Sequence, residues 1–252
     1  MIIISPSKNL NLVNESHKIE RSSPIFESYS KLLISKIKKL EEKDIKSLMN
    51  VSDSLAKLNY QRFKEMNNAR NVKKSAVFLF SGGTFSGLSI RSMKSSEFQN
   101  AQKKLRILSG LYGMLKPFDI IEPYRLEMGT NTAGILGNDL YRFWKKKITI
   151  EMNRDIKDTK SKFMYNLASK EYSSVLDFNE LECKVVNFDF KKKTNNKLQG
   201  IGMMIKKLRG SMASYIIRNK INNIEGLKNF NELGFKFLEL DNSNNQLIFV
   251  SR

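Results

Sequence analysis

The sequence predicts an α+β or α/β fold with a mixed central sheet, covering helices and terminal β-hairpins. Short apolar runs typical of buried strands occur at Met1–Ser5, Ala76–Phe80 and Phe163–Leu167, and segments with one apolar helical face separate them. Strand-like segments close to the C-terminus are joined by polar turns. The 252 residues contain no Pro/Ser/Gly-rich linker and no internal repeat, so we expect a single domain over residues 1–252.

The elements follow in order from these patterns. Expected helices cover Ser23–Leu40, Ile45–Met49, Ser52–Leu58, Tyr60–Met66, Glu97–Arg106, Asn138–Asp155 and Ile205–Lys220, with a short one beginning at Ala168-Ser169. Expected hairpins join Val185–Phe190 to Leu198–Ile205, around a turn over 191–196, and Gly234–Leu240 to Gln246–Val250 at a sheet edge. Between Ser81 and Gly87 we expect a glycine-rich loop after a strand; it lacks the Gly-Lys-Ser/Thr of a P-loop.

The charge balance is strongly basic. The chain has 44 Lys and Arg against 25 Asp and Glu, a formal net charge of +19. Such a charge favours polyanionic partners such as nucleic acid, nucleotides or anionic membrane. Lysine is nevertheless abundant everywhere, together with Ile and Asn, and the lysine pairs are evenly spread as on ordinary solvated faces. The composition therefore leaves both interpretations open.

Several kinds of chemistry are excluded by composition. Cys183 and His17 are the only residues of their types in the sequence. An intramolecular disulfide, a cysteine-cluster metal site and a two-histidine metal site cannot be built from them. We also expect no Ser–His or Cys–His nucleophile, because His17 lies in a polar segment typical of the surface. We therefore expect no metal and no cofactor. With neither a signal-like N-terminus nor a membrane-length apolar run, we expect a cytoplasmic protein without a membrane partner.

The stretch Leu105–Gly129 is the most unusual part of the chain. It is apolar yet contains Gly110 and Gly113, which destabilise a helix interior, so we expect a compact, buried, turn-rich segment. Arg125 and Glu127 emerge from these apolar surroundings. They either staple a buried loop to its surroundings or belong to a functional site.

Two further places carry cations at positions that suit an anion. Lys8 follows the first expected strand, and ligands of open α/β sheets bind beyond the carboxyl ends of strands. Taken alone, this loop favours the other interpretation, a strand-terminating turn with an incidental lysine. On the expected helix Ile205–Lys220, Lys206, Arg209 and Gly210 share one flank with Ala213. We favour an anion-binding groove there over a notch for helix packing.

Taken together, these segments resemble the YaaA family of bacterial peroxide-stress proteins. The matching motifs are ISPSK at 4–8, SDSLA at 52–56, RF at 62–63, SGLYGMLKP at 109–117, PYRLEMG at 123–129, DLYRFW at 139–144, NLASxEY at 166–172 and KKxRGxM at 206–212. The family pattern Gly-Asp-Val-Tyr is replaced here by Gly82-Gly83-Thr84-Phe85, so a family role for an acid or a phenol at this loop does not transfer.

The resemblance implies a cytosolic protein of the hydrogen-peroxide response that limits damage by lowering unincorporated iron. It also implies binding to double-stranded DNA, without sequence preference, through a positively charged cleft with a helix-hairpin-helix-like element. A hairpin over Leu108–Gly113 could supply backbone amides to a phosphate. The expected DNA- and anion-binding residues are Lys8, Gly110, Gly113, Arg125, Lys206, Arg209 and Gly210.

An enzyme is the alternative prediction. Its substrate would be a nucleotide or another phosphorylated small molecule. Arg125 and Arg209 would clamp the phosphate, and Glu127 would act as acid or base. Lys8 or Tyr124 would assist it.

Overall fold

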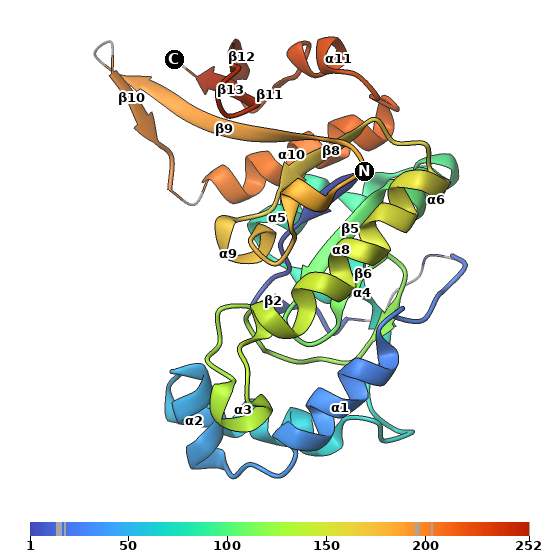
Figure 1. Cartoon of the computed structure of the whole chain (residues 1–252), viewed down its shortest axis with the longest axis vertical. Coiled ribbons are helices and arrows are strands. Elements are labelled where there is room, and N and C mark those ends of the chain that lie inside the picture. The colour runs from blue at the N-terminus through green and yellow to red at the C-terminus, as the bar shows by residue number, and fades with distance from the viewer. Residues whose placement is uncertain (14–16, 18, 195–196, 203, 252) are drawn as a thin grey trace.

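The computed structural model describes residues 1–13, 17, 19–194, 197–202 and 204–251. Its centre is a nine-stranded mixed sheet with the order β11-β12-β13-β9-β8-β1-β5-β6, in which β10 also pairs with β9 (Figure 1). The strands are β1 (Ile2–Ile4), β5 (Leu105–Ser109), β6 (Gly113–Leu115), β8 (Phe163–Leu167), β9 (Lys184–Thr194), β10 (Lys197–Gly200), β11 (Asn231–Glu232), β12 (Phe235–Asp241) and β13 (Gln246–Ser251). The predicted mixed sheet is confirmed.

Eleven α-helices occur in the described part of the chain, together with 3₁₀ turns at Ile90–Ser92 and Phe178–Glu180. They are α1 (Glu27–Ile37), α2 (Glu42–Met49), α3 (Asp53–Glu65), α4 (Ala76–Leu79), α5 (Gly83–Leu88), α6 (Ser95–Lys104), α7 (Ala133–Leu136), α8 (Leu140–Asp158), α9 (Lys170–Ser173), α10 (Met204–Arg218) and α11 (Ile224–Lys228). Two small ladders pair β2 (Asn9–Leu10) with β4 (Phe80–Ser81) and β3 (Lys74–Ser75) with β7 (Ile120–Ile121). No helix of these residues is both long and apolar enough to cross a membrane.

Strand β1 lies in the middle of the parallel part of the sheet. Its three isoleucines are fully buried and pair in parallel with β5 on one side and β8 on the other. A strand buried on both faces is apolar at every position, which explains why Ile2–Ile4 shows no alternation. The carboxyl ends of β1, β5 and β8 therefore lie at one edge of the sheet.

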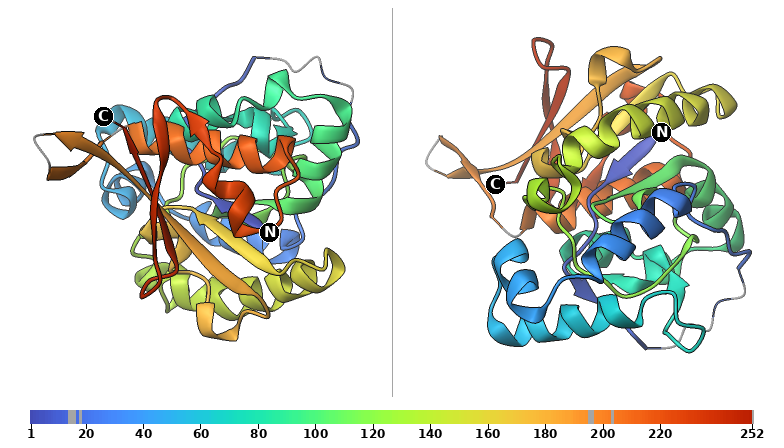
Figure 2. Two further views of the ribbon diagram at one scale, coloured as in Figure 1. Left: turned by 90° about the horizontal axis from the view of Figure 1, so that it is seen from above. Right: turned by 60° about the horizontal axis from the view of Figure 1, so that its bottom comes forward.

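Helices cover both faces of this sheet. Helix α10 packs across β1 and β8, and α8 lies on the opposite side, as the left view of Figure 2 shows. On the α8 face, the buried Arg106 of β5 makes two hydrogen bonds to the carboxylate of Asp155, at 2.5 and 2.6 Å. Helices α1–α3 lie below the sheet in Figure 1.

The predicted strand Ala76–Phe80 is wrong. Residues Ala76–Leu79 form one helical turn, and Phe80 and Ser81 alone enter a two-residue ladder with β2. A short apolar run bounded by turns is compatible with either a buried strand or a buried helix, because periodicity cannot distinguish them at this length. The turn is fully buried, which is the feature that made the sequence resemble a central strand.

The predicted glycine-rich loop is also wrong in part, because Gly83–Leu88 forms helix α5. Likewise, α3 is one helix where two were expected, and the region Leu198–Ile205 divides between β10 and the start of α10. The turn expected over 191–196 is wrong for its first four residues, because β9 continues to Thr194; residues 195 and 196 lie outside the described residues. The other predicted helices and hairpins are confirmed with shifted ends; the Asp139 side chain caps α8 by accepting from the Arg142 amide at 2.7 Å.

Helices α5 and α10 approach each other more closely than side chains would allow. Gly210 of α10 faces α5 so closely that a Cβ atom there would overlap the Thr84 carbonyl and lie 2.7 Å from the Leu88 amide nitrogen. Gly87 of α5 is the reciprocal case, since its Cβ would lie 2.8 Å from the Ser211 amide nitrogen. Two glycines thus allow backbone-to-backbone contact, and at Gly210 the flank predicted to receive an anion is occupied by helix packing.

We predict that Gly210→Ala destabilises the protein by about 1–3 kcal/mol or more, because the added methyl group meets backbone atoms that cannot turn away. Urea unfolding followed by circular dichroism measures this. The matched control is Gly134→Ala in α7, where an added Cβ meets nothing within 4 Å. The control should be neutral or slightly stabilising, since alanine favours the helix. Equal effects of the two substitutions would contradict the proposed close crossing.

Candidate functional site

Three segments distant in sequence meet beyond the carboxyl end of β1. The Ser5 hydroxyl accepts a hydrogen bond from the Ser169 amide at 2.8 Å and donates to the Ser169 hydroxyl at 3.2 Å. These contacts tie the loop after β1 to the start of α9. The third segment is the chain after β7, which contributes Arg125 and Glu127.

Glu127 joins two cations from different parts of the chain. Its Oε2 lies 2.6 Å from Lys8 Nζ, and its Oε1 accepts from Arg125 Nη2 at 2.9 Å and from Arg125 Nε at 3.2 Å. The Lys8 side chain is 58% exposed, whereas those of Arg125 and Glu127 are 16% and 24% exposed. The ion pairs are therefore anchored in the protein on one side and open to solvent on the Lys8 side.

The carboxylate of Glu127 is held in its charged form. Burial by itself raises the pKa of this carboxyl, but the hydrogen bonds and charges of Lys8 and Arg125 outweigh it and lower the pKa below its ordinary value. Glu127 is consequently ionised at neutral pH. It can act there as an anchor or a base, and a role as general acid does not fit this environment.

The start of α5 brings Lys206 to the same place. Gly82 has φ of 113°, and a Cβ atom at this position would lie 3.0 Å from the Ser7 hydroxyl oxygen, next to Lys8. A Cβ at Gly83 would lie 3.0 Å from the Cβ of Lys206. The loop after β1, the start of α5 and the first turns of α10 are thus adjacent. We call Lys8, Arg125, Glu127 and Lys206 the carboxyl-edge cluster.

Lys206 and Arg209 differ from Lys8 and Arg125 in making no contact with the Glu127 carboxylate. In the described part of the chain, neither has a hydrogen bond or an ion pair. Lys206 is exposed, and Arg209 is half-buried one turn further along α10. Burial lowers the pKa of Arg209, and the nearby Asp189 of β9 partly offsets this effect. These two side chains are the ones best placed to accept an external anion.

The remaining predicted site residues lie in the interior. The Tyr124 hydroxyl is 2.6 Å from the Ser109 hydroxyl, and burial raises the pKa of Tyr124 well above its usual range. A Cβ at Gly110 would overlap the Leu126 carbonyl, and one at Gly113 (φ 71°) would lie 2.8 Å from the Trp144 ring. Both glycines therefore serve close packing here, and we leave them and Tyr124 out of the anion-binding surface proposed below.

The segment Leu108–Gly113 contains no helix pair. It joins β5 to β6 as an antiparallel β-hairpin, with Ser109 opposite Gly113, and it is buried throughout. The expectation of a helix-hairpin-helix-like element there is therefore wrong. The helix pair with a short connection is α2–α3, whose turn contains Asn50 with φ of 48°.

The sequence did not single out two residues that complete the surroundings of the cluster. Glu171 of α9 accepts a hydrogen bond from the Gly129 amide at 3.2 Å, and its own carbonyl accepts one from the Tyr141 hydroxyl at 2.9 Å. Ser169 holds the loop after β1, as described above. Ser169 and Glu171 both fall in the NLASxEY motif at 166–172, and this motif was the sequence feature that could have identified them. Among the described residues, no group of three or more His, Cys, Asp or Glu is arranged to hold a metal ion.

Known proteins resemble this chain over nearly its whole length. The family described as "Peroxide stress protein YaaA" matches residues 1–240. A UPF0246 protein of Legionella pneumophila (strain Corby) is 39% identical over 253 aligned positions, covering 99% of this chain and 98% of the relative. A UPF0246 protein of Rickettsia africae is 39% identical over 250 positions, with 99% of each chain covered.

The lowered pKa of Glu127 predicts a pH dependence of stability. A carboxyl whose pKa is depressed on folding stabilises the protein above its unfolded value of 4.5, and that contribution is lost as the pH falls through the folded pKa. The free energy of unfolding should thus fall more steeply between about pH 5 and pH 3 in the wild type than in Glu127→Gln. Urea titrations at each pH test this.

The control is Glu225→Gln, which removes one partner of the exposed Lys228–Glu225 pair. It should follow the wild-type slope. Parallel curves for wild type and Glu127→Gln would show that the Lys8–Glu127–Arg125 arrangement does not hold in solution.

Proposed function

Because the chain belongs to the YaaA family of peroxide stress proteins, we propose that it limits oxidative damage in the hydrogen-peroxide response by binding double-stranded DNA and lowering unincorporated iron. The proposed DNA-binding surface is formed by Lys206 and Arg209 of α10 with Lys8 and Arg125 beside them. Binding is independent of base sequence, and we place the protein in the cytoplasm.

The observation that carries this proposal is that Lys206 and Arg209 make no ion pair and no hydrogen bond within the described residues. A cation that is already neutralised, as Lys8 is by Glu127, has less to offer a phosphate than one without a partner. Both unpaired cations lie on the first turns of one helix, within a chain of net charge +19. Phosphate neutralisation with release of counterions would then provide most of the affinity.

The helix pair α2–α3 is a second contact to the duplex in this proposal. The family resemblance implies a helix-hairpin-helix-like element, and α2–α3 has the required order of helix, short turn and helix. The N-cap Ser52 makes no side-chain hydrogen bond to the first turn of α3. The amides of that turn are therefore available to a phosphate oxygen, as at other helix N-termini.

We propose that the effect on iron is indirect. One histidine and one cysteine in the whole sequence do not suffice for the ligand sets of iron stores, in which histidine pairs accompany carboxylates. DNA binding and the lowering of iron are thus two separate properties of the protein in this proposal. They can be measured separately.

The Glu127 carboxylate between Lys8 and Arg125 favours a second candidate, an enzyme acting on a nucleotide or another phosphorylated small molecule. In that function Arg125 and Arg209 bind the phosphate, and the ionised Glu127 serves as base. Glu127→Gln separates the candidates. A DNA-binding protein should retain or increase its affinity when a negative charge leaves the surface, whereas the enzyme should lose turnover and keep ligand binding.

We predict that the affinity for a fluorescent 20-base-pair duplex falls steeply with salt. Lys206→Met and Arg209→Met should each weaken this affinity roughly three- to tenfold. Each should also reduce the slope of log affinity against log salt concentration by about one. Fluorescence anisotropy from low to moderate salt measures both quantities. Scrambling the duplex sequence should leave the affinity unchanged.

The matched control is Lys157→Met, which removes an exposed lysine near the other end of the sheet, on α8. It should change the affinity less than twofold, because the protein keeps its local charge at α10. A flat salt response, or equal losses in all three variants, would contradict the proposed surface.

The iron effect requires cells. In a bacterium that lacks its own family member, expression of the wild-type chain during peroxide exposure should reduce iron accessible to a cell-permeant chelator. A Lys206→Met/Arg209→Met double variant expressed at the same level tests whether the effect passes through the DNA-binding surface. If chelatable iron is the same with and without the wild-type chain, the iron part of the proposal is wrong.

A further inference from the structure

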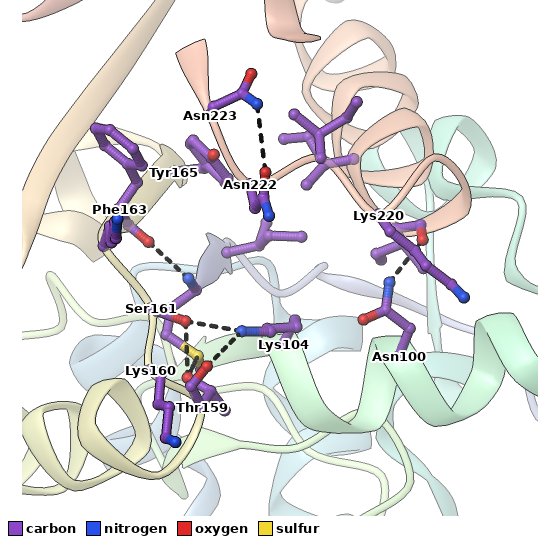
Figure 3. A pocket seen from close by; sticks show the side chains of 16 residues that line it. Asn100, Lys104, Thr159, Lys160, Ser161, Phe163, Tyr165, Lys220, Asn222 and Asn223 are labelled. Carbon is purple, nitrogen blue, oxygen red and sulfur yellow. Dashed lines mark hydrogen bonds between the residues drawn. The ribbon is translucent and has the colours of Figure 1, made fainter.

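A cavity lies at the opposite edge of the sheet from the carboxyl-edge cluster. It has a volume of about 690 Å³ and lies at the amino ends of β1 and β8, between α6, the end of α8 and α10 (Figure 3). Its size is within the range of small-molecule sites, about 300–1,000 Å³. The proposed DNA-binding function makes no use of it.

Tyr165 of β8 is the first indication that this cavity receives a ligand. Its side chain lines the cavity and the residue is 3% exposed, yet the hydroxyl has no hydrogen-bond partner among the described residues. Burial raises the pKa of Tyr165 to about 12, so the hydroxyl stays protonated and able to donate. A buried polar group without a partner is costly, and the cost is removed when a bound molecule offers an acceptor.

Lys104 supplies the charge. Its ammonium group reaches across the cavity to Ser161 and Thr159, as Figure 3 shows, and donates to the Ser161 hydroxyl at 2.9 Å and the Thr159 carbonyl at 3.0 Å. These two acceptors are neutral, and within the described residues Lys104 has no ion pair. Burial, followed by the charge of Lys103, lowers the pKa of Lys104, so an anion bound beside it would be favourable.

The rest of the lining indicates what surrounds that anionic group. Ile216, Ile217 and Ile221 contribute apolar side chains to the lining, and Phe163 contributes an aromatic one. Not one Asp or Glu is among the lining residues. Lys160, Lys162, Lys220 and the N-terminal amine of Met1 also line the cavity. Figure 3 shows the ammonium groups of Lys160 and Lys220 turned away, and burial, followed by the charge of Lys104, lowers the pKa of the Met1 amine to about 5.

We propose that this cavity binds a small organic anion, with its carboxylate or phosphate at Lys104, a hydrogen-bond acceptor at the Tyr165 hydroxyl and its apolar body against the isoleucines. Asn222 and Asn223 lie at the rim, where their amides can contact polar substituents. The requirement for both a charge and an apolar body distinguishes this site from a surface that merely attracts phosphate.

Isothermal titration calorimetry with three probes tests the proposal. Phenyl phosphate carries both features, phenol has only the ring, and inorganic phosphate has only the charge. Phenyl phosphate should bind at least about tenfold more tightly than either of the others, because an apolar contact and a charged hydrogen bond each contribute. Lys104→Met should weaken its binding roughly tenfold and Tyr165→Phe roughly threefold to tenfold.

Lys103→Met is the matched control, since it removes a neighbouring exposed lysine from the same helix. It should leave the affinity unchanged, and Tyr165→Phe should not lower the unfolding temperature of the free protein, because its hydroxyl makes no bond there. In wild-type protein, phenyl phosphate should shift the amide NMR signals of Asn100, Asn222 and Asn223, which decides the matter even if Lys104→Met does not fold. Equal affinities for phenyl phosphate and inorganic phosphate, or equal losses in the two lysine variants, would overturn the proposal.

Discussion

The backbone contact between α5 and α10 is the constraint on which the candidate site depends. With Gly210 against Thr84 and Gly87 against Lys207 and Ser211, the relative positions of the two helices are determined by main-chain atoms that cannot adopt other rotamers. The same crossing brings Lys206 beside Gly83 and lays α10 across β1 and β8. Glycine lowers the stability of each helix because its helix propensity is low, so its presence in α5 and α10 is explained by the close crossing.

Patterns that act over a few residues were sufficient to predict much of the fold. The buried strands β1 and β8, the cap and apolar stripe of α8, and the terminal hairpin follow from local periodicity and caps. The sequence misled at Ala76–Gly87, where a buried apolar run indicated a strand and a run of glycines indicated a loop. Tertiary packing determines both outcomes. The turn at Ala76–Leu79 packs against the short strands β3, β4 and β7, outside the central sheet, and Gly87 of α5 allows the close approach of α10.

The candidate site was predictable residue by residue but not as an arrangement. Lys8 and Lys206 were recognisable from their positions after a strand and on a helix flank. The Arg125–Glu127 contact spans two residues and is local, but nothing local indicates that Glu127 also contacts Lys8, since that contact depends on where β1 and the chain after β7 end in space. Gly110 and Gly113 illustrate the opposite error. Glycines required for contact with Leu126 and Trp144 look, in sequence, the same as glycines that bind phosphate.

The two edges of the sheet present cations in different ways, and this difference carries a consequence for selectivity. At the carboxyl edge, Lys206 and Arg209 belong to a helix surface next to partly exposed ion pairs, where salt screens the charges and an extended polyanion gains by contacting several at once. At the amino edge, Lys104 lies within a cavity walled by isoleucines, where screening is weaker and a single charge counts for more. Under the two proposals, high salt should therefore release DNA from the first edge while leaving a small organic anion at the second. That separation follows from the depth at which each cation is placed and not from the total charge of the chain.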